Sequence, residues 1–268
     1  MLRVRVVSAA LLLPIVAFFV YRGGFLFALG VGVVAALALN EFFHMLSRQG
    51  DRPLRLLGGG ATALLILNGL GLGATLDQAA VALLVFGGLL WELASYQAGN
   101  SMRGWALTIA GVLYIGWPLG LAVALRELPN GITWVLVVAV AIWSCDTGAY
   151  FGGRFLGGKL TDGRRFSPRW SPKKTWEGFV TGLLLCLLVT AALSHWLLDL
   201  PLWQGIVLGL ALGPAAVSGD LAESMVKRRV GVKDSGDLIP GHGGMLDRID
   251  SLLFGAVAAY FFAQWLVY

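Results

Sequence analysis

The sequence predicts an all-α, polytopic membrane protein with about nine transmembrane helices. Only 13% of its 268 residues are charged, 57% are hydrophobic, and the mean hydropathy is +0.78. An average soluble domain carries roughly 25% charged residues, so this chain has too little polar surface to cover a soluble globule. The apolar residues also gather in stretches of about 20, the length that crosses a hydrocarbon core about 30 Å thick.

Nine apolar stretches qualify as spans. The first resembles a signal peptide, but no small-residue cleavage site precedes Tyr21 and Arg22, and another apolar stretch follows, so we interpret it as a helix. The third, fourth and eighth contain many glycines or polar residues and are the weakest. The predicted spans are 4–21, 25–46, 55–73, 77–94, 104–126, 131–151, 175–197, 201–222 and 250–267.

The distribution of Lys and Arg predicts the orientation. With a cytoplasmic N-terminus, all of the 20 Lys and Arg except Arg22 and Arg126 lie in cytoplasmic segments. This bias satisfies the positive-inside rule and favours nine spans, since omitting one span would place many of these residues on the opposite side of the membrane. It also accounts for the net charge of +5 without a nucleic-acid partner. We therefore expect a cytoplasmic N-terminus and an external C-terminus.

Polar residues are unevenly distributed along the chain. Residues 1–103 are mostly plain hydrophobic helix, which we interpret as a transmembrane scaffold and dimer surface. Residues 104–268 form the predicted catalytic region, with two long cytoplasmic segments at 152–174 and 223–249.

The two cysteines indicate no special chemistry. Cys145 and Cys186 both fall in apolar stretches, so they form neither a disulfide framework nor a zinc site and are expected to pack as small hydrophobic residues.

Carboxylates inside or at the edge of a span are costly, so they are usually paired or functional. Asp146 lies about one and a half turns before the end of the sixth span. Its position close to the basic face of the membrane favours a functional role. The alternative is a helix-end carboxylate that pairs with a nearby cation such as Arg154.

A second acid lies near the cytoplasmic end of the eighth span. If that helix continues, four polar residues share one of its faces: Asp220, Glu223, Ser224 and Lys227. The alternative is a polar stripe that faces a water-filled cleft. The glycine that precedes Asp220, Gly219, indicates that another part of the molecule or a ligand approaches the backbone closely at this point.

A third polar group is the segment 241–250, which leads into the last span. Glycines on both sides of His242 allow positive φ and expose N–H groups, and such concave N–H arrays bind anions. Asp247 and Asp250 would lie on one face of the helix. The ordinary explanation for an acid at a helix start is that it complements the positive end of the helix dipole. That explanation does not account for the glycines, both acids and Arg248 occurring together.

These groups together have the chemistry of phosphoryl or nucleotidyl transfer. Carboxylates suit Mg²⁺, which takes oxygen ligands and keeps water and phosphate in its shell. The sequence contains no Walker A motif and no GxGxxG after a strand, which excludes the usual soluble nucleotide-binding classes. Cations able to hold phosphates lie in the same region: Lys227, Arg228, Arg229, Lys233 and Arg248.

The basic segment 152–174 has two interpretations. For Arg164, Arg165 and Arg169, positive-inside charge and attraction to anionic lipid are sufficient. The segment 171–174, which reads Ser-Pro-Lys-Lys, favours a function in binding.

Thr175 is a plausible cap for the seventh span, with Glu177 in its first turn. A phosphate could dock at that helix start, beside Lys173 and Lys174.

The segment from Ser224 to Asp250 carries a specific pattern. It reads Ser-x-x-Lys-Arg, four residues, Lys-Asp, then Pro-x-His-Gly-Gly-x-x-Asp-Arg-x-Asp. It resembles, without departure, the signature of the phosphatidate cytidylyltransferase (CDP-diacylglycerol synthase) family. Ser144–Tyr150, Ser171–Gly178 and Gly219–Ser224 also look like family motifs in the expected order, so the resemblance covers about 144–250.

The resemblance implies a reaction in which a phosphatidate oxygen attacks the α-phosphorus of CTP, giving CDP-diacylglycerol and pyrophosphate. It implies Mg²⁺, with K⁺ at a paired site, a homodimer, and contact with membrane lipids. By analogy, it also implies a bacterial inner (plasma) membrane location with the active site on the cytoplasmic side. The implied metal ligands are Asp220, Asp247 and Asp250, with Asp146 as a further supporting acid.

The remaining roles follow from the same resemblance. His242 either orients a phosphate or hydrogen-bonds the loop, and both alternatives stay open, while His44 and His195 are interpreted as structural. The residues implied to act in catalysis are Asp220, Asp247, Lys227, Arg228 and His242. The residues implied to bind substrate are Asp146, Ser171, Lys173, Lys174, Glu223, Ser224, Lys233, Asp234, Gly243, Gly244 and Arg248.

Three other functions remain possible from the sequence. A transporter would bind ions or protons at Asp146 and Asp220. A related enzyme would use another lipid acceptor, such as an archaeal ether lipid or a polyprenol. A non-catalytic scaffold would be unaffected by changes at Asp247.

Overall fold

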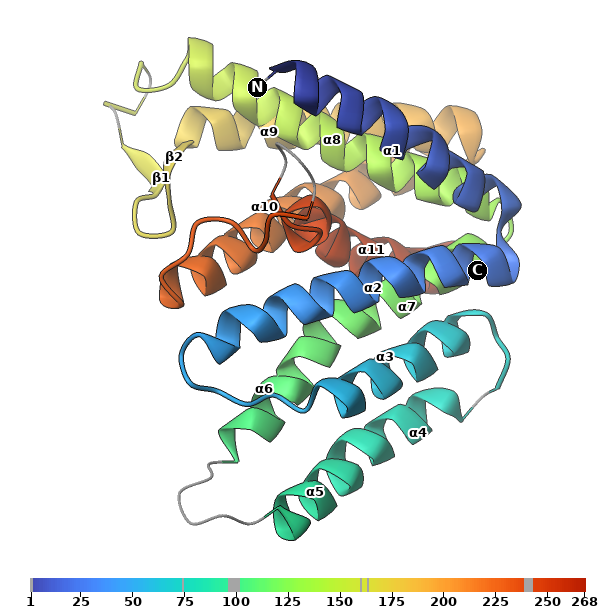
Figure 1. Cartoon of the computed structure of the whole chain (residues 1–268). Coiled ribbons are helices and arrows are strands. Elements are labelled where there is room, and N and C mark those ends of the chain that lie inside the picture. Colours follow the sequence, from blue (N-terminus) through green and yellow to red (C-terminus); the bar gives the residue numbers. More distant parts are fainter. Residues whose placement is uncertain (1, 74, 96–101, 160, 163, 239–242) are drawn as a thin grey trace. The chain divides into compact units, whose positions relative to one another are not determined.

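The computed structural model describes residues 2–73, 75–95, 102–159, 161–162, 164–238 and 243–268, and it is mostly helical (Figure 1). The chain forms two compact units. The first unit comprises Met1–Glu127 and Arg229–Arg248, and the second comprises Leu128–Arg228 and Ile249–Tyr268. This boundary differs from the division at residue 103 drawn from the sequence, whose assignment of scaffold and catalytic roles stays a prediction.

The first unit is built from helices with two π-helical segments, η1 and η2, each of which continues an α-helix on both sides. Its elements are α1 (Leu2–Arg22), α2 (Gly24–Ser47), α3 (Arg55–Gly69), α4 (Leu76–Ala82), η1 (Leu83–Gly87), α5 (Gly88–Ala94), α6 (Arg103–Gly111), η2 (Val112–Gly116) and α7 (Trp117–Glu127).

Packing in the first unit centres on α3. A buried apolar core joins Ala61 and Leu65 of α3 to Leu84 of η1 and Val112 of η2. Where α3 meets α7 the backbones are very close, because a Cβ atom on Gly120 would lie 2.6 Å from the Leu65 carbonyl oxygen. Small residues allow this close approach of membrane helices.

The second unit contains four long helices and a hairpin. Its elements are α8 (Gly131–Phe155), β1 (Arg165–Ser167), β2 (Ser171–Thr175), α9 (Trp176–Leu197), α10 (Leu202–Arg229) and α11 (Leu246–Leu266). The last residue of α10 and residues 246–248 of α11 belong to the first unit.

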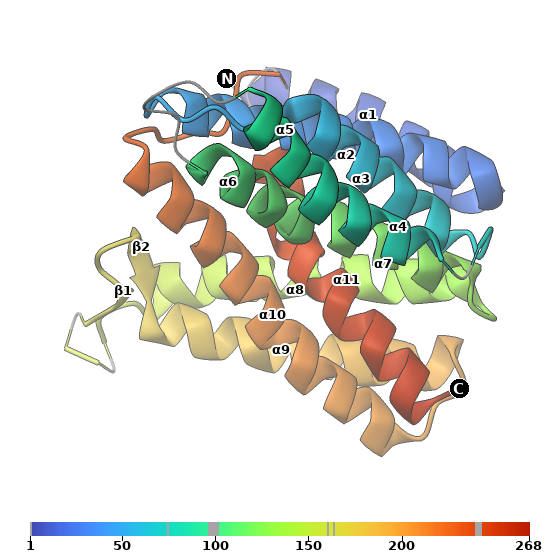
Figure 2. The same cartoon turned by 90° about the horizontal axis from the view of Figure 1, so that it is seen from below.

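Helices α8 and α9 lie side by side in both views (Figures 1 and 2). A Cβ on Gly182 would lie 2.8 Å from the carbonyl oxygen of Cys145, so only glycine fits there. The Thr181 hydroxyl donates to the carbonyl of Gly148 at 3.0 Å across the interface. Close packing of α8 and α9 therefore fixes both ends of the segment that joins them.

The predicted all-α membrane class is confirmed. Seven helices in the described part of the chain are long and apolar enough to cross a membrane, and helices lie at all nine predicted stretches. The other two are α3, with 15 residues, and α1, whose apolar part Ala10–Arg22 is shorter. The count of nine spans stays a prediction.

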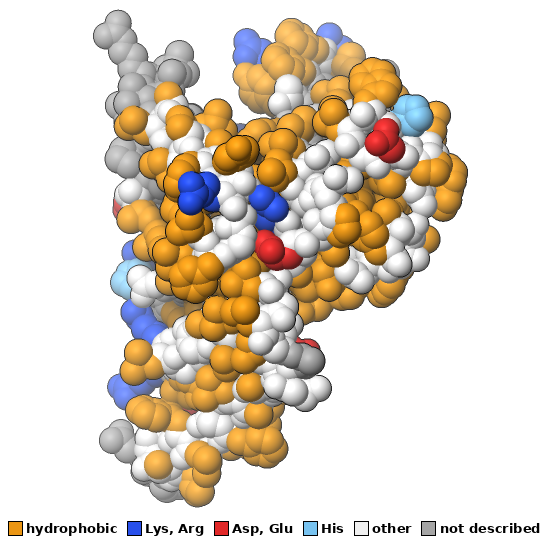
Figure 3. All heavy atoms as spheres, turned by 90° about the vertical axis from the view of Figure 1, so that its right-hand side faces the viewer, with side chains coloured by type: hydrophobic (Ala, Val, Ile, Leu, Met, Phe, Trp, Pro, Cys, Tyr) orange, Lys and Arg blue, Asp and Glu red, His pale blue; other side chains and the backbone are white. Residues whose placement is uncertain are grey.

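The surface matches a lipid environment. Large apolar side chains of the second unit are exposed, among them Leu184, Leu188 and Trp196 of α9. Hydrophobic side chains also dominate the face drawn in Figure 3. Such a surface is stable when lipid tails cover it.

The segment 152–174 is not simply a loop. Helix α8 continues to Phe155, and β1 pairs antiparallel with β2, with Arg165 opposite Thr175 and Ser167 opposite Ser171. Strands this short show no alternating pattern in sequence, which is why the hairpin was not predicted.

Candidate active site

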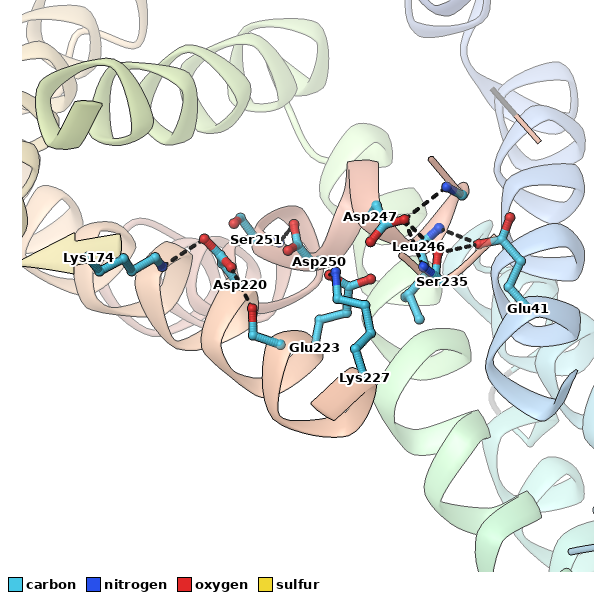
Figure 4. A network of polar contacts seen from close by, with 12 residues as sticks. Glu41, Lys174, Asp220, Glu223, Lys227, Ser235, Leu246, Asp247, Asp250 and Ser251 are labelled. Atoms are coloured by element: carbon cyan, nitrogen blue, oxygen red, sulfur yellow. Dashed lines mark hydrogen bonds and ion pairs between the residues drawn. The ribbon is translucent and has the colours of Figure 1, made fainter. Parts of the chain in front are cut away.

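A first group of polar residues lies in the second unit, at the end of α10, and we call it the Asp220 cluster: Lys174, Asp220, Glu223, Ser224, Lys227 and Asp250. Figure 4 shows all of these except Ser224 by label. The Lys174 ammonium lies 2.7 Å from Asp220 Oδ2, and the Ser224 hydroxyl donates to Asp220 Oδ1 at 3.3 Å. Because β2 ends one residue after Lys174, the hairpin delivers this cation to the carboxylate.

The same face of α10 continues one turn further. Lys227 donates to Glu223 Oε2 at 2.6 Å, and both side chains are buried. Residues four apart lie above one another on a helix, so the predicted shared face is confirmed. Separating the partners of a buried ion pair would leave uncompensated buried charges, which is strongly destabilising. The pair therefore holds both side chains in place beside Asp220.

Asp250 is brought to this cluster by close backbone packing. A Cβ atom on Gly219 would collide with the carbonyl oxygen of Asp250 and lie 2.9 Å from Ser251 Cα. The close approach predicted at Gly219 is therefore confirmed, and α11 is what approaches. The Asp250 carboxylate lies close to the side chains of Asp220, Glu223 and Lys227 (Figure 4).

A second group of polar residues lies in the first unit, where α11 begins, and we call it the Asp247 cluster: Glu41, Ser235, Gly243, Gly244 and Asp247. Figure 4 labels Glu41, Ser235 and Asp247. Asp247 Oδ2 accepts hydrogen bonds from Ser235 N at 2.9 Å, Ser235 Oγ at 3.0 Å and Gly244 N at 2.9 Å. Gly243 has φ +84°, the positive φ that the sequence predicted for this loop.

These bonds change the interpretation of the glycine segment. The sequence predicts that its N–H groups bind an anion, yet the N–H of Gly244 donates to Asp247. Asp247 therefore also has the ordinary role of an acid at a helix start. His242, on which a catalytic role was predicted, lies outside the described residues.

Most of the other predicted site residues are exposed. Asp146 is an exposed residue of α8, and Arg154, its proposed partner, donates to the Tyr150 hydroxyl at 2.8 Å. Ser171 is half-buried in β2. Five further predicted site residues are exposed, in β2, near a helix end or in the loop that follows α10: Lys173, Arg228, Lys233, Asp234 and Arg248.

The capping of α9 was predicted correctly. The Thr175 hydroxyl accepts from Gly178 N at 3.1 Å, as an N-cap residue does. Glu177 does more than complement the helix dipole. It is 4% exposed, and its Oε1 accepts from Gly158 N, Thr161 N and Thr161 Oγ1 at 2.8–3.0 Å, which holds the segment before the hairpin.

Replacing Glu177 with glutamine is expected to loosen this segment. Hydrogen bonds to a charged group contribute about 1.5–3 kcal/mol, so trypsin cleavage after the exposed Lys159 should rise about tenfold. Limited proteolysis of the purified protein measures this. Glu127→Gln removes an acid that accepts a single main-chain N–H elsewhere and should leave cleavage after Lys159 unchanged. Equal cleavage of both variants would contradict the role of Glu177.

Sequence reasoning missed Glu41 and Ser235. Glu41 is an acid within a predicted span, the same signal that singled out Asp146 and Asp220, but it lies in the half assigned to the scaffold. Ser235 is buried, and its N–H donates to Asp247. Nothing in the sequence around Ser235 indicates this contact.

Each cluster by itself carries carboxylates, which are donors that suit a hard cation. Asp220 and Asp250 belong to the second unit and Asp247 to the first, so their common ligation of a metal stays a prediction. Among the described residues, no three His, Cys, Asp or Glu side chains are arranged to hold a metal ion. The carboxylate oxygens are nevertheless the ligands that Mg²⁺ prefers, and Asp220 forms an ion pair with Lys174.

Comparison with known proteins agrees with this chemistry. The model of the Cytidylyltransferase family matches residues 3–266. A protein of Brucella melitensis named phosphatidate cytidylyltransferase is 36% identical over 97% of this chain and 93% of its own length. Proteins of the same name from Synechocystis and Haemophilus influenzae are 33% and 35% identical, over 98% and 94% of this chain and 97% and 95% of their own lengths.

Proposed function

Because the chain belongs to the cytidylyltransferase family, we propose that the Asp220 and Asp247 clusters carry out transfer of CMP from CTP to phosphatidate. The protein is an enzyme of phospholipid biosynthesis, a nucleotidyltransferase that forms CDP-diacylglycerol and releases pyrophosphate. The observation that carries the assignment of residues is the gathering of Asp220, Glu223 and Asp250 with two lysines at the end of α10.

The reaction makes one phosphorus–oxygen bond and breaks another. An oxygen of the phosphatidate phosphate attacks the α-phosphorus of CTP, and the bond to the bridging oxygen breaks as pyrophosphate leaves. A phosphate monoester is already a good nucleophile, so little general-base help is required. The barrier falls mainly through positioning and through neutralisation of the phosphate charges.

The residues of the Asp220 cluster supply both signs of charge for this task. Lys174 is half-exposed and ion-paired with Asp220, so it can exchange its carboxylate for a substrate phosphate at little cost. Lys227 is held by a buried carboxylate and keeps a fixed position. Arg228, Lys233 and Arg248 bind further phosphate oxygens in this proposal.

Mg²⁺, with K⁺ as a second cation, is part of the same proposal. Asp220, Asp247 and Asp250 would hold the divalent ion, which neutralises phosphate charge when bound. The acids are hard oxygen donors on two helix segments, and their chemistry fits that ion.

The location of the reaction follows from the substrates. The protein is an integral membrane protein, and the lipid tails of phosphatidate remain in the bilayer. We propose the inner membrane of a bacterium, with the N-terminus and the active site on the cytoplasmic side, because the bias of Lys and Arg favours that orientation. We also propose a homodimer.

Reconstitution tests the function directly. Purified protein in vesicles that contain phosphatidate should form CDP-lipid and pyrophosphate when CTP and Mg²⁺ are added, and omission of any one component should abolish the product. Ion flux without product would favour a transporter. Product from a polyprenyl phosphate or an ether lipid, and none from phosphatidate, would assign another acceptor.

A further inference from the structure

Glu41 is an acid in the last two turns of an apolar helix. It lies in α2, where it is half-buried, and α2 is one of the candidate membrane spans. A carboxylate in such a helix is costly, so it is retained only where specific partners or a function compensate for it. Its partners are in the Asp247 cluster (Figure 4).

Both carboxylate oxygens of Glu41 bind the beginning of α11. Oε1 accepts from Met245 N at 2.8 Å, and Oε2 accepts from Leu246 N at 2.9 Å. The first N–H groups of a helix have no partner within the helix. Glu41 therefore acts as a cap for α11, although it lies about 200 residues earlier in the chain.

Ser235 links Glu41 to Asp247. Its hydroxyl oxygen lies 2.9 Å from Glu41 Oε2 and 3.0 Å from Asp247 Oδ2, and its N–H donates to the same oxygen of Asp247. A hydroxyl has one proton, so the two carboxylates share a single donor. Movement of Glu41 therefore changes the bonding of Asp247.

Two glycines of the surrounding backbone pack closely against this arrangement. A Cβ on Gly244 would collide with Ser235 Oγ and Glu41 Oε2, and a Cβ on Gly236 would lie 3.0 Å from Glu41 Oε1. The two glycines contact the carboxylate closely, so the geometry of the cluster depends on the Glu41 side chain itself.

We propose that Glu41 is a positioning residue for the cytidylyltransfer reaction. It holds the segment 243–246 and, through Ser235, the carboxylate of Asp247 in the geometry that the reaction requires. This inference rests on the proposed role of Asp247. It assigns a specific task to a part of the chain that the sequence indicated only as scaffold.

Glu41→Gln is the primary test. Glutamine keeps the size of the side chain but replaces one acceptor oxygen with an NH₂ group that faces main-chain N–H donors. Mutation of residues that orient metal ligands typically costs about 10–100-fold in affinity or activity. We expect kcat to fall about tenfold or more and the Mg²⁺ concentration for half-maximal rate to rise by a similar factor.

Glu127→Gln is the matched control. Glu127 also lies in the first unit and also accepts a main-chain N–H at the start of a helix, that of Gly24 at 3.0 Å. Its replacement should leave kcat and the Mg²⁺ requirement unchanged. Melting temperatures of both variants, measured with and without Mg²⁺ and CTP, provide a readout that does not depend on turnover. The stabilisation by these ligands should shrink only in Glu41→Gln.

Ser235→Ala tests the link. If Ser235 connects the two carboxylates, the effects of Ser235→Ala and Glu41→Gln on kcat should be strongly non-additive in the double variant. Additive effects would contradict the connection through Ser235.

The outcomes separate this inference from the proposed function. Wild-type behaviour of Glu41→Gln beside an inactive Asp247→Asn would overturn the positioning role and leave the function intact. A fall in activity matched by a lower melting temperature, with an unchanged Mg²⁺ requirement, would also overturn it, because Glu41 would then only stabilise the fold. Absence of CDP-lipid from the wild-type protein would instead reject the function.

Discussion

Replacing Asp247 with asparagine is expected to reduce CDP-diacylglycerol formation at least about a hundredfold, the scale of a lost electrostatic or metal contribution to the transition state. Asp247 Oδ2 accepts three hydrogen bonds, from Ser235 and Gly244. Asparagine has the same shape, so the loop should remain folded, but it lacks the negative charge that a divalent cation requires.

The measurement is the initial rate of CDP-lipid formation at saturating CTP and phosphatidate, with the melting temperature recorded in parallel. Asp77→Asn is the matched control. Asp77 is also an acid in the first turn of a helix, α4, and it accepts the N–H of Gln78 at 2.8 Å. It should retain full activity. An Asp247→Asn protein that keeps more than about a tenth of the wild-type rate would contradict the assigned role.

Replacing Gly219 with valine is expected to abolish activity and to destabilise the second unit. A Cβ at this position collides with the backbone of Asp250 and Ser251, which cannot move aside as a flexible side chain can. Overpacking of this kind costs about 1–3 kcal/mol or more. Separation of α10 from α11 would also draw Asp250 away from Asp220, so we expect the rate to fall at least about a hundredfold.

Gly32→Val is the control for this change. Gly32 lies within α2, and nothing lies within 4 Å of the Cβ that it would gain. The same substitution should therefore leave the rate and the melting temperature nearly unchanged. Comparable losses in both variants would show that helix propensity, and not the approach of α11, explains the effect at Gly219.

The sequence predicts most of what depends on local pattern. The hydrophobic stretches correctly predicted helices at every predicted span. The residue pattern also identified Thr175 as a cap, and helical spacing predicted the shared face of Asp220 and Lys227. Each of these follows from residues that lie within a few positions of one another.

Features that depend on distant partners could not be predicted in this way. The contacts of Glu41 with Met245 and Leu246 join segments about 200 residues apart, and no local pattern identifies such a pairing. The hairpin was missed because a three-residue strand has no periodicity. The length of α3 was overestimated because apolar residues continue beyond Gly69, where the helix ends.

The dependence of Glu41 on residues so far along the chain affects how the protein is made. At roughly 5–20 residues per second, a ribosome needs about 10–40 s to reach Leu246 after it has synthesised Glu41. During this interval the carboxylate must be hydrated or bound by the insertion machinery, because an unpaired acid in hydrocarbon is costly. Biogenesis of the first unit is therefore completed only when the last helix begins to emerge.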